Sequence, residues 1–260
     1  MSAIPLALAF TLLQSGPDPL VGVRRGDLPV VITAPHGGRR PLLGVPLRTG
    51  DGVAKFVVVN DTNTGVLAEK VAAAIEKATG KPPHLVVARF ERKYCDLNRP
   101  ADTAYESVGA KPAYDAYHAA VREACERVTK EYGTGLLLDL HGQAAKADAI
   151  FRGTQNGKTV KLLTDRHGAK AITGPESVQG RLEKKGYNFF PAAESSELED
   201  RRFNGGYTVA TYGTTSGLDA IQFELGGDSR SRKALDTTAA DLADAVMAFA
   251  EAYLPKDKKK

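Results

Sequence analysis

Residues 135–142 read Gly-Leu-Leu-Leu-Asp-Leu-His-Gly, an apolar run that ends in an acid, a histidine and a glycine. This pattern is typical of a buried strand whose last residues emerge from a sheet into a cleft. Two other stretches have the same form, since Pro-Val-Val-Ile-Thr-Ala-Pro precedes His36 and Phe-Val-Val-Val-Asn precedes Asp61. Ligands of open α/β sheets sit beyond the carboxyl ends of the strands. We therefore expect His36, Asp61 and His141 to meet at one edge of a sheet.

The rest of the chain alternates between strand and helix patterns, which predicts parallel βαβ units. We expect strands at 29–34, 56–59, 84–90, 136–140, 208–212 and 218–225, and helices at 65–78, 112–130, 175–185 and 233–253. The Asn156-Gly157 pair predicts a hairpin between 150–154 and 158–161. Residues 39–53 and the acidic stretch 194–200 are expected to form loops. The predicted fold is a three-layer α/β domain with a mixed, mostly parallel sheet flanked by helices.

Composition and charge limit the function classes. A chain of 260 residues with 42% hydrophobic content can bury a full core. The net charge is +4, and the tail 255–260 supplies +3 of it through four lysines and one aspartate. The body is therefore nearly neutral and lacks the basic stripe of a nucleic-acid binder. No stretch has the 18 to 20 apolar residues, roughly, that a membrane span needs. The sequence does not indicate the oligomeric state.

We expect three parts: a leader or signal-like segment and a connector at 1–28, a single catalytic domain at 29–254 and the basic tail at 255–260. The stretch from Ile4 to Leu13 resembles the core of a signal peptide, but no basic residues precede it. Export to the periplasm or medium and a cytoplasmic location both remain open. The two cysteines, Cys95 and Cys125, have no spacing that indicates a zinc knuckle or a disulfide framework.

The three strand-end residues suit one zinc ion. A hydrolytic zinc site has about three protein ligands and one open position, and His36, Asp61 and His141 fit that count. Bound zinc lowers the pKa of its water to about 7. A carboxylate must still take and return the proton, and Glu224 follows a further apolar run where it could do so.

Arg92 and Arg99 have two interpretations. In a loop bounded by a proline beside the site edge, the two guanidinium groups could hold a carboxylate and stabilise an oxyanion. Alternatively, they form a surface cluster of salt bridges with Glu91 and Asp96, which would contribute little energy.

Together these residues carry a family resemblance. The chain resembles the N-formylglutamate amidohydrolase family over roughly residues 30 to 230, and that family is similar in fold to zinc carboxypeptidases and aspartoacylases. The motifs, in order, are Pro-His36-Gly-Gly, Asp61, Arg92 with Asp96-Leu-Asn-Arg99, Asp139-Leu-His141, Phe203-Asn-Gly-Gly-Tyr207 and Gln222-Phe-Glu224.

The resemblance implies a role for each matched residue. The implied zinc ligands are His36, Asp61 and His141. Glu224 would be the general base and acid, and Arg92 would polarise the scissile carbonyl. Asn98 and Arg99 would grip a carboxylate of the substrate, and the pocket would be lined by Gly205, Gly206 and Tyr207. One departure is that Arg39 stands three residues after His36, where carboxypeptidases have a glutamate ligand, so Asp61 must serve instead.

We therefore expect a zinc-dependent hydrolase that cleaves the amide of a small carboxylate-bearing substrate, N-formylglutamate or another N-acyl amino acid. The alternative enzyme is a carboxypeptidase or amidase that acts on peptides, γ-glutamyl chains or cell-wall material. A non-catalytic binding module that keeps the fold is the third possibility.

Overall fold

The computed structural model describes residues 20–259, except for residues 52, 54 and 55. These residues form a seven-stranded sheet with the order β1-β3-β2-β4-β7-β5-β6. The strands are β1 (Val21–Arg24), β2 (Val30–Ala34), β3 (His84–Ala88), β4 (Leu136–Gly142), β5 (Ala149–Gly153), β6 (Asn188–Phe190) and β7 (Asp219–Leu225). The four central strands β3, β2, β4 and β7 are parallel, whereas β1 and β5 run antiparallel to their neighbours β3 and β7.

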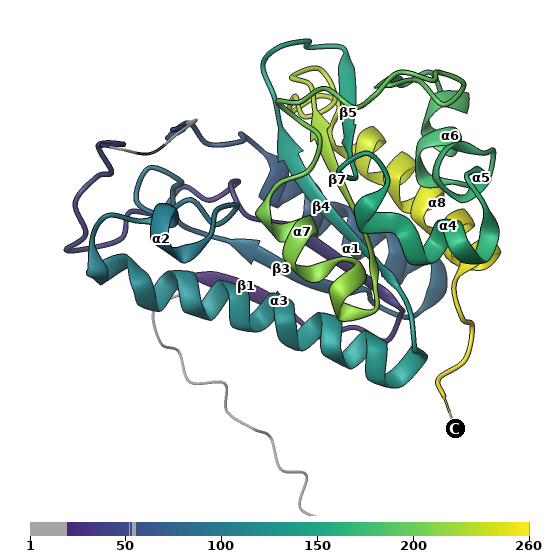
Figure 1. Cartoon of the computed structure of the whole chain (residues 1–260), viewed down its shortest axis with the longest axis horizontal. Coiled ribbons are helices and arrows are strands. Elements are labelled where there is room, and N and C mark those ends of the chain that lie inside the picture. The colour runs from purple at the N-terminus through teal and green to yellow at the C-terminus, as the bar shows by residue number, and fades with distance from the viewer. Residues whose placement is uncertain (1–19, 52, 54–55, 260) are drawn as a thin grey trace, which may run out of the picture.

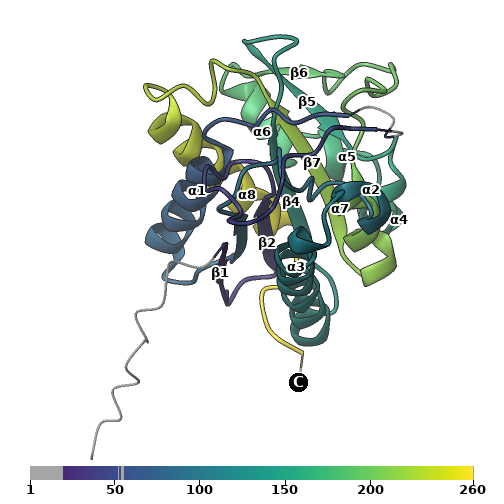
Figure 2. The same cartoon turned by 90° about the vertical axis from the view of Figure 1, so that its left-hand side faces the viewer.

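Helices cover both faces of the sheet (Figure 1). The helices are α1 (Thr64–Thr79), α2 (Ala101–Ala104), α3 (Lys111–Tyr132), α4 (Lys161–His167), α5 (Lys170–Thr173), α6 (Val178–Lys184), α7 (Tyr207–Tyr212) and α8 (Leu235–Tyr253). One hydrophobic cluster joins the sheet to α1, α4, α5, α6 and α8, and a second joins its other face to α3 and α7. In Figure 2, α1 and α8 lie on one side of the sheet, and α3 and α7 on the other. The expected three-layer α/β fold is confirmed.

Strand β4 has a different character on each face of the sheet. Because side chains alternate along a strand, Leu136, Leu138 and Leu140 all join the cluster beneath α1 and α8. Leu137 joins the cluster beneath α3. Asp139 and His141 follow Leu137 on that second face, both buried. One face of β4 is therefore purely core, and the other ends in two polar side chains.

The long helices match the sequence patterns. In α1, Leu67, Val71 and Ile75 are fully buried at helical spacing. The helix ends at Gly80, whose φ of 71° is a conformation that glycine adopts without strain. The predictions of α3, α6 and α8 are also confirmed, with shifts of at most three residues at their ends.

The predicted strand at 56–59 is wrong, because these residues form a loop with Val59 72% exposed. The physical reason lies in the sheet: β2 already has β3 and β4 as neighbours, so no edge remains there for another strand. Asp61 consequently reaches the site from a loop. Its backbone N–H donates to the carbonyl of His36 at 3.0 Å.

The predicted hairpin around Asn156-Gly157 is also wrong. Three consecutive residues after β5 have positive φ, with values of 51° at Gln155, 54° at Asn156 and 91° at Gly157. This left-handed turn directs the chain into a short 3₁₀ helix and then α4 instead of a returning strand.

The predicted strand at 208–212 is helix α7. The buried Val209 and Tyr212 lie three residues apart and join the cluster with α3, which is a helical spacing. Strands β1 and β6 were not predicted, and β1 uses part of the expected connector. The loop 194–200 is irregular as expected, but Glu199 within it is 4% exposed.

The proposed signal-like stretch from Ile4 to Leu13 lies outside the described residues. Among the helices that the structure does describe, none combines the length and apolar character needed to cross a bilayer.

His84 at the start of β3 predicts a loss of stability in acid. It is buried, and its Nδ1 accepts a hydrogen bond from the backbone N–H of Gly26 at 3.2 Å. Burial lowers the pKa of His84 from 6.5 to about 4. Between these two pH values the unfolded chain binds more protons at this site than the native protein, so the stability falls as the pH falls.

We expect His84→Asn, which offers a neutral acceptor in place of Nδ1, to remove this effect. As the pH falls from 6.5 to 4, the free energy of unfolding of the native sequence should decrease relative to that of His84→Asn by up to about 1.4 kcal/mol per pH unit. Urea unfolding of both proteins across this range measures the difference, and a difference that does not change with pH would contradict the prediction.

Candidate metal centre

The carboxyl ends of β2, β4 and β7 converge on one site. The chain leaves β2 through α1 to reach β3 on one side, and returns through α3 to reach β4 on the other. Ligands bind at such a reversal of strand order in open α/β sheets. His36 lies two residues after β2, His141 lies within β4, and its partner in the register of β7 is Glu224.

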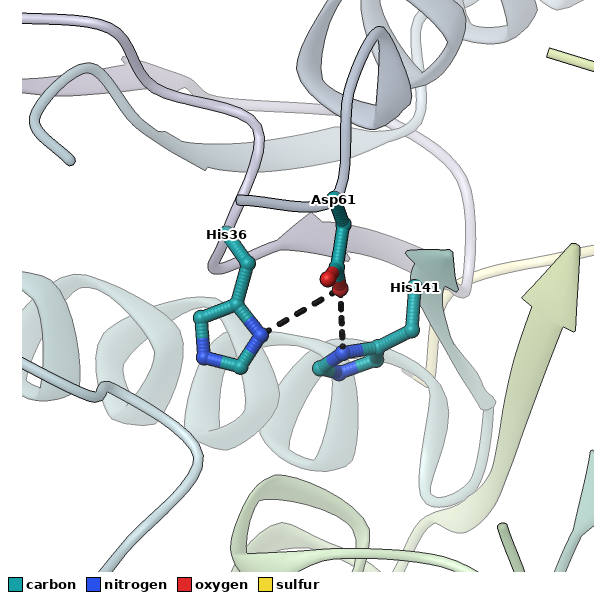
Figure 3. Close-up of side chains that lie close together, drawn as sticks. All are labelled: His36, Asp61 and His141. Atoms are coloured by element: carbon teal, nitrogen blue, oxygen red, sulfur yellow. Dashed lines mark hydrogen bonds and ion pairs between the residues drawn. The ribbon is translucent and has the colours of Figure 1, made fainter. Parts of the chain in front are cut away.

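His36, Asp61 and His141 point toward one another, as Figure 3 shows. Asp61 Oδ2 lies 3.3 Å from His36 Nδ1 and 3.1 Å from His141 Nδ1. One ligand atom from each residue lies within 4.8 Å of the others, and all three residues are buried. The structure therefore brings together the three residues that the sequence predicted as metal ligands.

Two further carboxylates hold the far side of each imidazole. His36 Nε2 lies 2.8 Å from Asp96 Oδ1, and His141 Nε2 lies 2.9 Å from Asp139 Oδ2. The other oxygen of Asp139 accepts a hydrogen bond from the Thr33 hydroxyl at 2.6 Å. If each Nε2 carries the proton and donates it to its carboxylate, both Nδ1 lone pairs face Asp61. Histidine ligands of metals are usually held in this way.

The donor set and its spacing fit a tetrahedral metal ion. Two imidazoles and one carboxylate are ligands that zinc accepts. Bond lengths of about 2.0 Å at tetrahedral angles separate neighbouring ligand atoms by about 3.3 Å. The distances from Asp61 Oδ2 to the two Nδ1 atoms have this size. These residues are a possible metal-binding triad.

The electrostatic potential at the triad is negative. Burial opposes the ionised form of Asp61, but when Nδ1 of His141 and of His36 carries a proton, the hydrogen bonds from these rings outweigh burial and lower the pKa of Asp61. The pKa of His141 is raised well above its usual value: burial opposes the charged form, and attraction to Asp139, together with hydrogen bonds to Asp139 and Asp61, overcomes it. A field that attracts a proton this strongly also attracts a divalent cation.

Glu224 is a half-buried carboxylate in the cavity that Asp61 and His141 also line, whereas His36 is fully buried behind them. Its Oε1 accepts a hydrogen bond from Gln222 Nε2 at 2.9 Å. Burial is the largest influence and raises the pKa of Glu224 to about 7, while His141 lowers it and Asp61 raises it. A carboxyl group with this pKa can both accept and return a proton near neutral pH.

The loop 91–100 contributes buried polar groups, not a surface cluster. Arg92 is 9% exposed, and its Nε and Nη2 donate to Asp96 Oδ2 at 3.0 and 2.7 Å. The buried Asn98 accepts a hydrogen bond from the backbone N–H of Thr208 at 2.9 Å. The side chain of Arg99 is half-buried beside it.

A cavity of about 390 Å³ opens beside the triad. Its lining includes most of the predicted site residues: Asp61, Arg92, Asn98, Arg99, His141, Gly205, Gly206 and Glu224. A Cβ on Gly206 would lie 2.1 Å from Asn98 Nδ2, so only glycine allows this close approach. Tyr207 is not among the lining residues, and its ring packs against His118.

Four polar residues next to the triad were not predicted to have roles. Asp96, Asp139 and Gln222 lie inside the quoted motifs, and a polar residue in an apolar strand was the available signal for the last two. Arg230 also lines the cavity, but it stands in a polar turn and has no distinguishing pattern.

Comparisons with known proteins identify relatives of this chain. Residues 109–229 match the family model of N-formylglutamate amidohydrolase. An N-formylglutamate deformylase of Pseudomonas putida is 23% identical over 241 residues, which cover 80% of this chain and 84% of the relative. The resemblance to the N-formylglutamate amidohydrolase family is confirmed. Because the matched proteins are amidohydrolases, the expectation of a hydrolytic enzyme is confirmed as well.

Solved structures share the fold. The N-formylglutamate amidohydrolase of Ralstonia eutropha aligns with a TM-score of 0.57 and 19% identity, over 90% of this chain and 98% of its own. A gene product of Agrobacterium tumefaciens aligns with the same TM-score and 14% identity, over 90% of this chain and 94% of its own.

The contact between Asp139 and His141 predicts that Asp139→Asn weakens metal binding. An amide is a weaker acceptor than a carboxylate, and it can turn its NH₂ toward Nε2 and so favour the wrong tautomer. We expect the dissociation constant for zinc to rise about 10- to 100-fold. Competition with a chromophoric chelator measures this constant. The control is Asp165→Asn, an exposed carboxylate paired with Lys161, and equal affinities of the two variants would contradict the prediction.

Proposed function

We propose that this protein is a zinc-dependent hydrolase that cleaves the amide of an N-formyl or N-acyl amino acid such as N-formylglutamate. The observation that carries the proposal is the cluster of His36, Asp61 and His141 beside a cavity that Asp61, His141 and Glu224 line. The family match to amidohydrolases supports the reaction type.

His36, Asp61 and His141 would hold one zinc ion, with their geometry maintained by Asp96 and Asp139. When bound, zinc supplies a Lewis acid that activates water and polarises a carbonyl group. The three buried ligands carry one net negative charge when both imidazoles are neutral, so a dipositive ion leaves the site with a positive charge that favours a developing oxyanion.

Glu224 would act as the general base and then as the general acid. The carboxylate removes a proton from the attacking water and delivers it to the leaving amine nitrogen, which allows the C–N bond to break. Its hydrogen bond from Gln222 orients one oxygen and leaves the other for this proton. Before a metal binds, burial raises the pKa of Glu224 to about 7, so this carboxyl group can exchange a proton near neutral pH.

Arg92 would polarise the scissile carbonyl. Two of its nitrogens are bound to Asp96, while Nη1 lies 3.8 Å from Asp61 Oδ1, and Arg92 is one of the residues that line the same cavity. A guanidinium held at this position adds positive charge where the carbonyl oxygen becomes negative in the transition state.

Arg99 and Asn98 would bind a carboxylate of the substrate. Arg92, Arg99, Arg202 and Arg230 all line the cavity, and this excess of guanidinium groups over Asp61 and Glu224 favours an anionic substrate. Gly205 and Gly206 would form the pocket wall, with Tyr207 behind them at the start of α7.

The deciding experiment is the zinc content of the purified protein together with amine release from a panel of substrates. The panel contains N-formyl and N-acetyl amino acids, short peptides and γ-glutamyl chains. We expect one zinc per chain and a preference for N-formylglutamate. Activity only on peptides or γ-glutamyl chains would support the proposed metal site but assign a different substrate. A protein that binds no zinc after reconstitution would refute the assignment of the triad as metal ligands.

The variant Glu224→Gln separates chemistry from metal binding. We expect turnover to fall at least about 100-fold, because the amide cannot accept the proton. Zinc content should stay at one per chain, since Glu224 is not among the proposed ligands. Unchanged turnover would remove Glu224 from the mechanism.

Arg99→Ala should discriminate between substrates. If Arg99 holds a carboxylate by charge-assisted hydrogen bonds, its loss should raise KM about 10- to 100-fold for a substrate with a free carboxylate. The matched substrate in which that carboxylate is an amide should be affected by less than about threefold. Steady-state kinetics on the pair test this, and an equal loss on both substrates would make Arg99 a structural residue.

A further inference from the structure

Arg230 connects three segments of the candidate site. It lies in the turn between β7 and α8, and its side chain is half-buried at the wall of the cavity. Nε donates to the carbonyl of Leu225 at 2.9 Å, Nη1 to that of Thr62 at 2.7 Å, and Nη2 to that of Gln143 at 3.0 Å. Each nitrogen of one guanidinium therefore binds a different stretch of backbone.

These three carbonyl groups belong to the neighbours of site residues. Thr62 follows the proposed ligand Asp61, Leu225 follows Glu224, and Gln143 stands two residues after His141. His141 and Glu224 are in addition held by the pairing of β4 with β7. Asp61 lies in a loop without strand pairing, and its backbone N–H is bonded to the carbonyl of His36 and not to β4 or β7. The bond from Nη1 ties this loop to the ends of the two strands.

We propose that Arg230 is a positioning residue that holds the Asp61 loop in register with the ends of β4 and β7, and so preorganises the zinc ligands Asp61 and His141. The inference rests on the proposed zinc site. The planar guanidinium carries five N–H donors in a fixed fork, so it can reach three carbonyls in one plane. The single ammonium of a lysine cannot reproduce this geometry.

The surroundings of Arg230 are built for this position. A Cβ on Gly142 would lie 2.6 Å from Arg230 Cζ, so the absence of a side chain there admits the guanidinium against the end of β4. The carbonyl of Arg230 in turn accepts a hydrogen bond from Asn63 Nδ2 at 2.8 Å. Arg230 is thus bound to the Asp61 loop through both its guanidinium group and its backbone carbonyl.

A purely electrostatic role makes the opposite prediction. The positive charge of Arg230 repels a divalent cation, so its removal would tighten zinc binding if charge alone mattered. A role in positioning predicts weaker binding, because the ligands then lose conformational entropy when the metal binds. The sign of the change therefore separates the two explanations.

The experiment measures zinc affinity by chelator competition for the native sequence, Arg230→Met and Arg230→Lys. We expect both variants to bind zinc about 10- to 100-fold more weakly, with lysine giving no rescue. The absorption spectrum of the Co²⁺-substituted proteins should change in band position or intensity, which reports altered ligand geometry. The matched control is Arg232→Met, an exposed arginine two residues further on, and it should bind zinc like the native sequence.

A milder variant keeps the test decisive if the Arg230 variants do not fold. Asn63 has a φ of 68°, so Asn63→Gly removes its side chain without straining the backbone. We expect this variant to weaken zinc binding by a smaller factor, about threefold to tenfold.

The outcomes separate this inference from the proposed function. Zinc binding by the native sequence together with unchanged or tighter binding by the folded Arg230 variants would overturn the positioning role alone. Unchanged binding by Asn63→Gly, with Arg230 variants that do not fold, would overturn it too. Failure of the native sequence to bind zinc would overturn the proposed function, and this inference with it.

Discussion

The parallel pairing of β4 with β2 and β7 determines the arrangement of the site. Its register sets Asp139 beside Thr33 and His141 beside Glu224. A shift of one residue would exchange the two faces of the strand, so the leucines would face the cavity and the polar residues would enter the core beneath α1. The leucines that bury β4 on one face therefore also align the polar residues on the other. Packing energy and site geometry depend on the same register.

Burial of so many charged groups is tolerated because each has a partner. Asp96 binds both His36 and Arg92, and Asp139 binds both His141 and Thr33. A buried ion without such partners would cost several kcal/mol. Attraction to His36 and Arg92 outweighs burial and lowers the pKa of Asp96 well below its usual value. The network restricts the imidazole rings to one orientation, which reduces the conformational entropy that metal binding must remove.

Strand-end patterns in the sequence were sufficient to predict the fold class and the triad, because burial and polarity change abruptly where a strand leaves the core. The pattern failed where an apolar run had no neighbour in the sheet, as at 56–59, and where three left-handed residues replaced a hairpin. Asp61 was nevertheless predicted correctly as part of the triad, although its position depends on loop contacts. The tethers of that loop could not be predicted, since Arg230 acts on backbone carbonyls, which have no signature in the sequence.

The left-handed turn at 155–157 has a consequence for the evolution of the pocket. The backbone N–H groups of Thr154 and Asn156 and the Thr154 hydroxyl donate to the carboxylate of Glu199, and Gln179 binds the carbonyl of Pro191. The segment between Pro191 and Glu199 is mostly exposed and does not line the cavity. The next residue along the chain that lines the cavity is Arg202. Insertions between Pro191 and Glu199 can therefore alter this exposed surface without moving the cavity wall. The fold separates a part that can diverge in length from a part that must keep its shape.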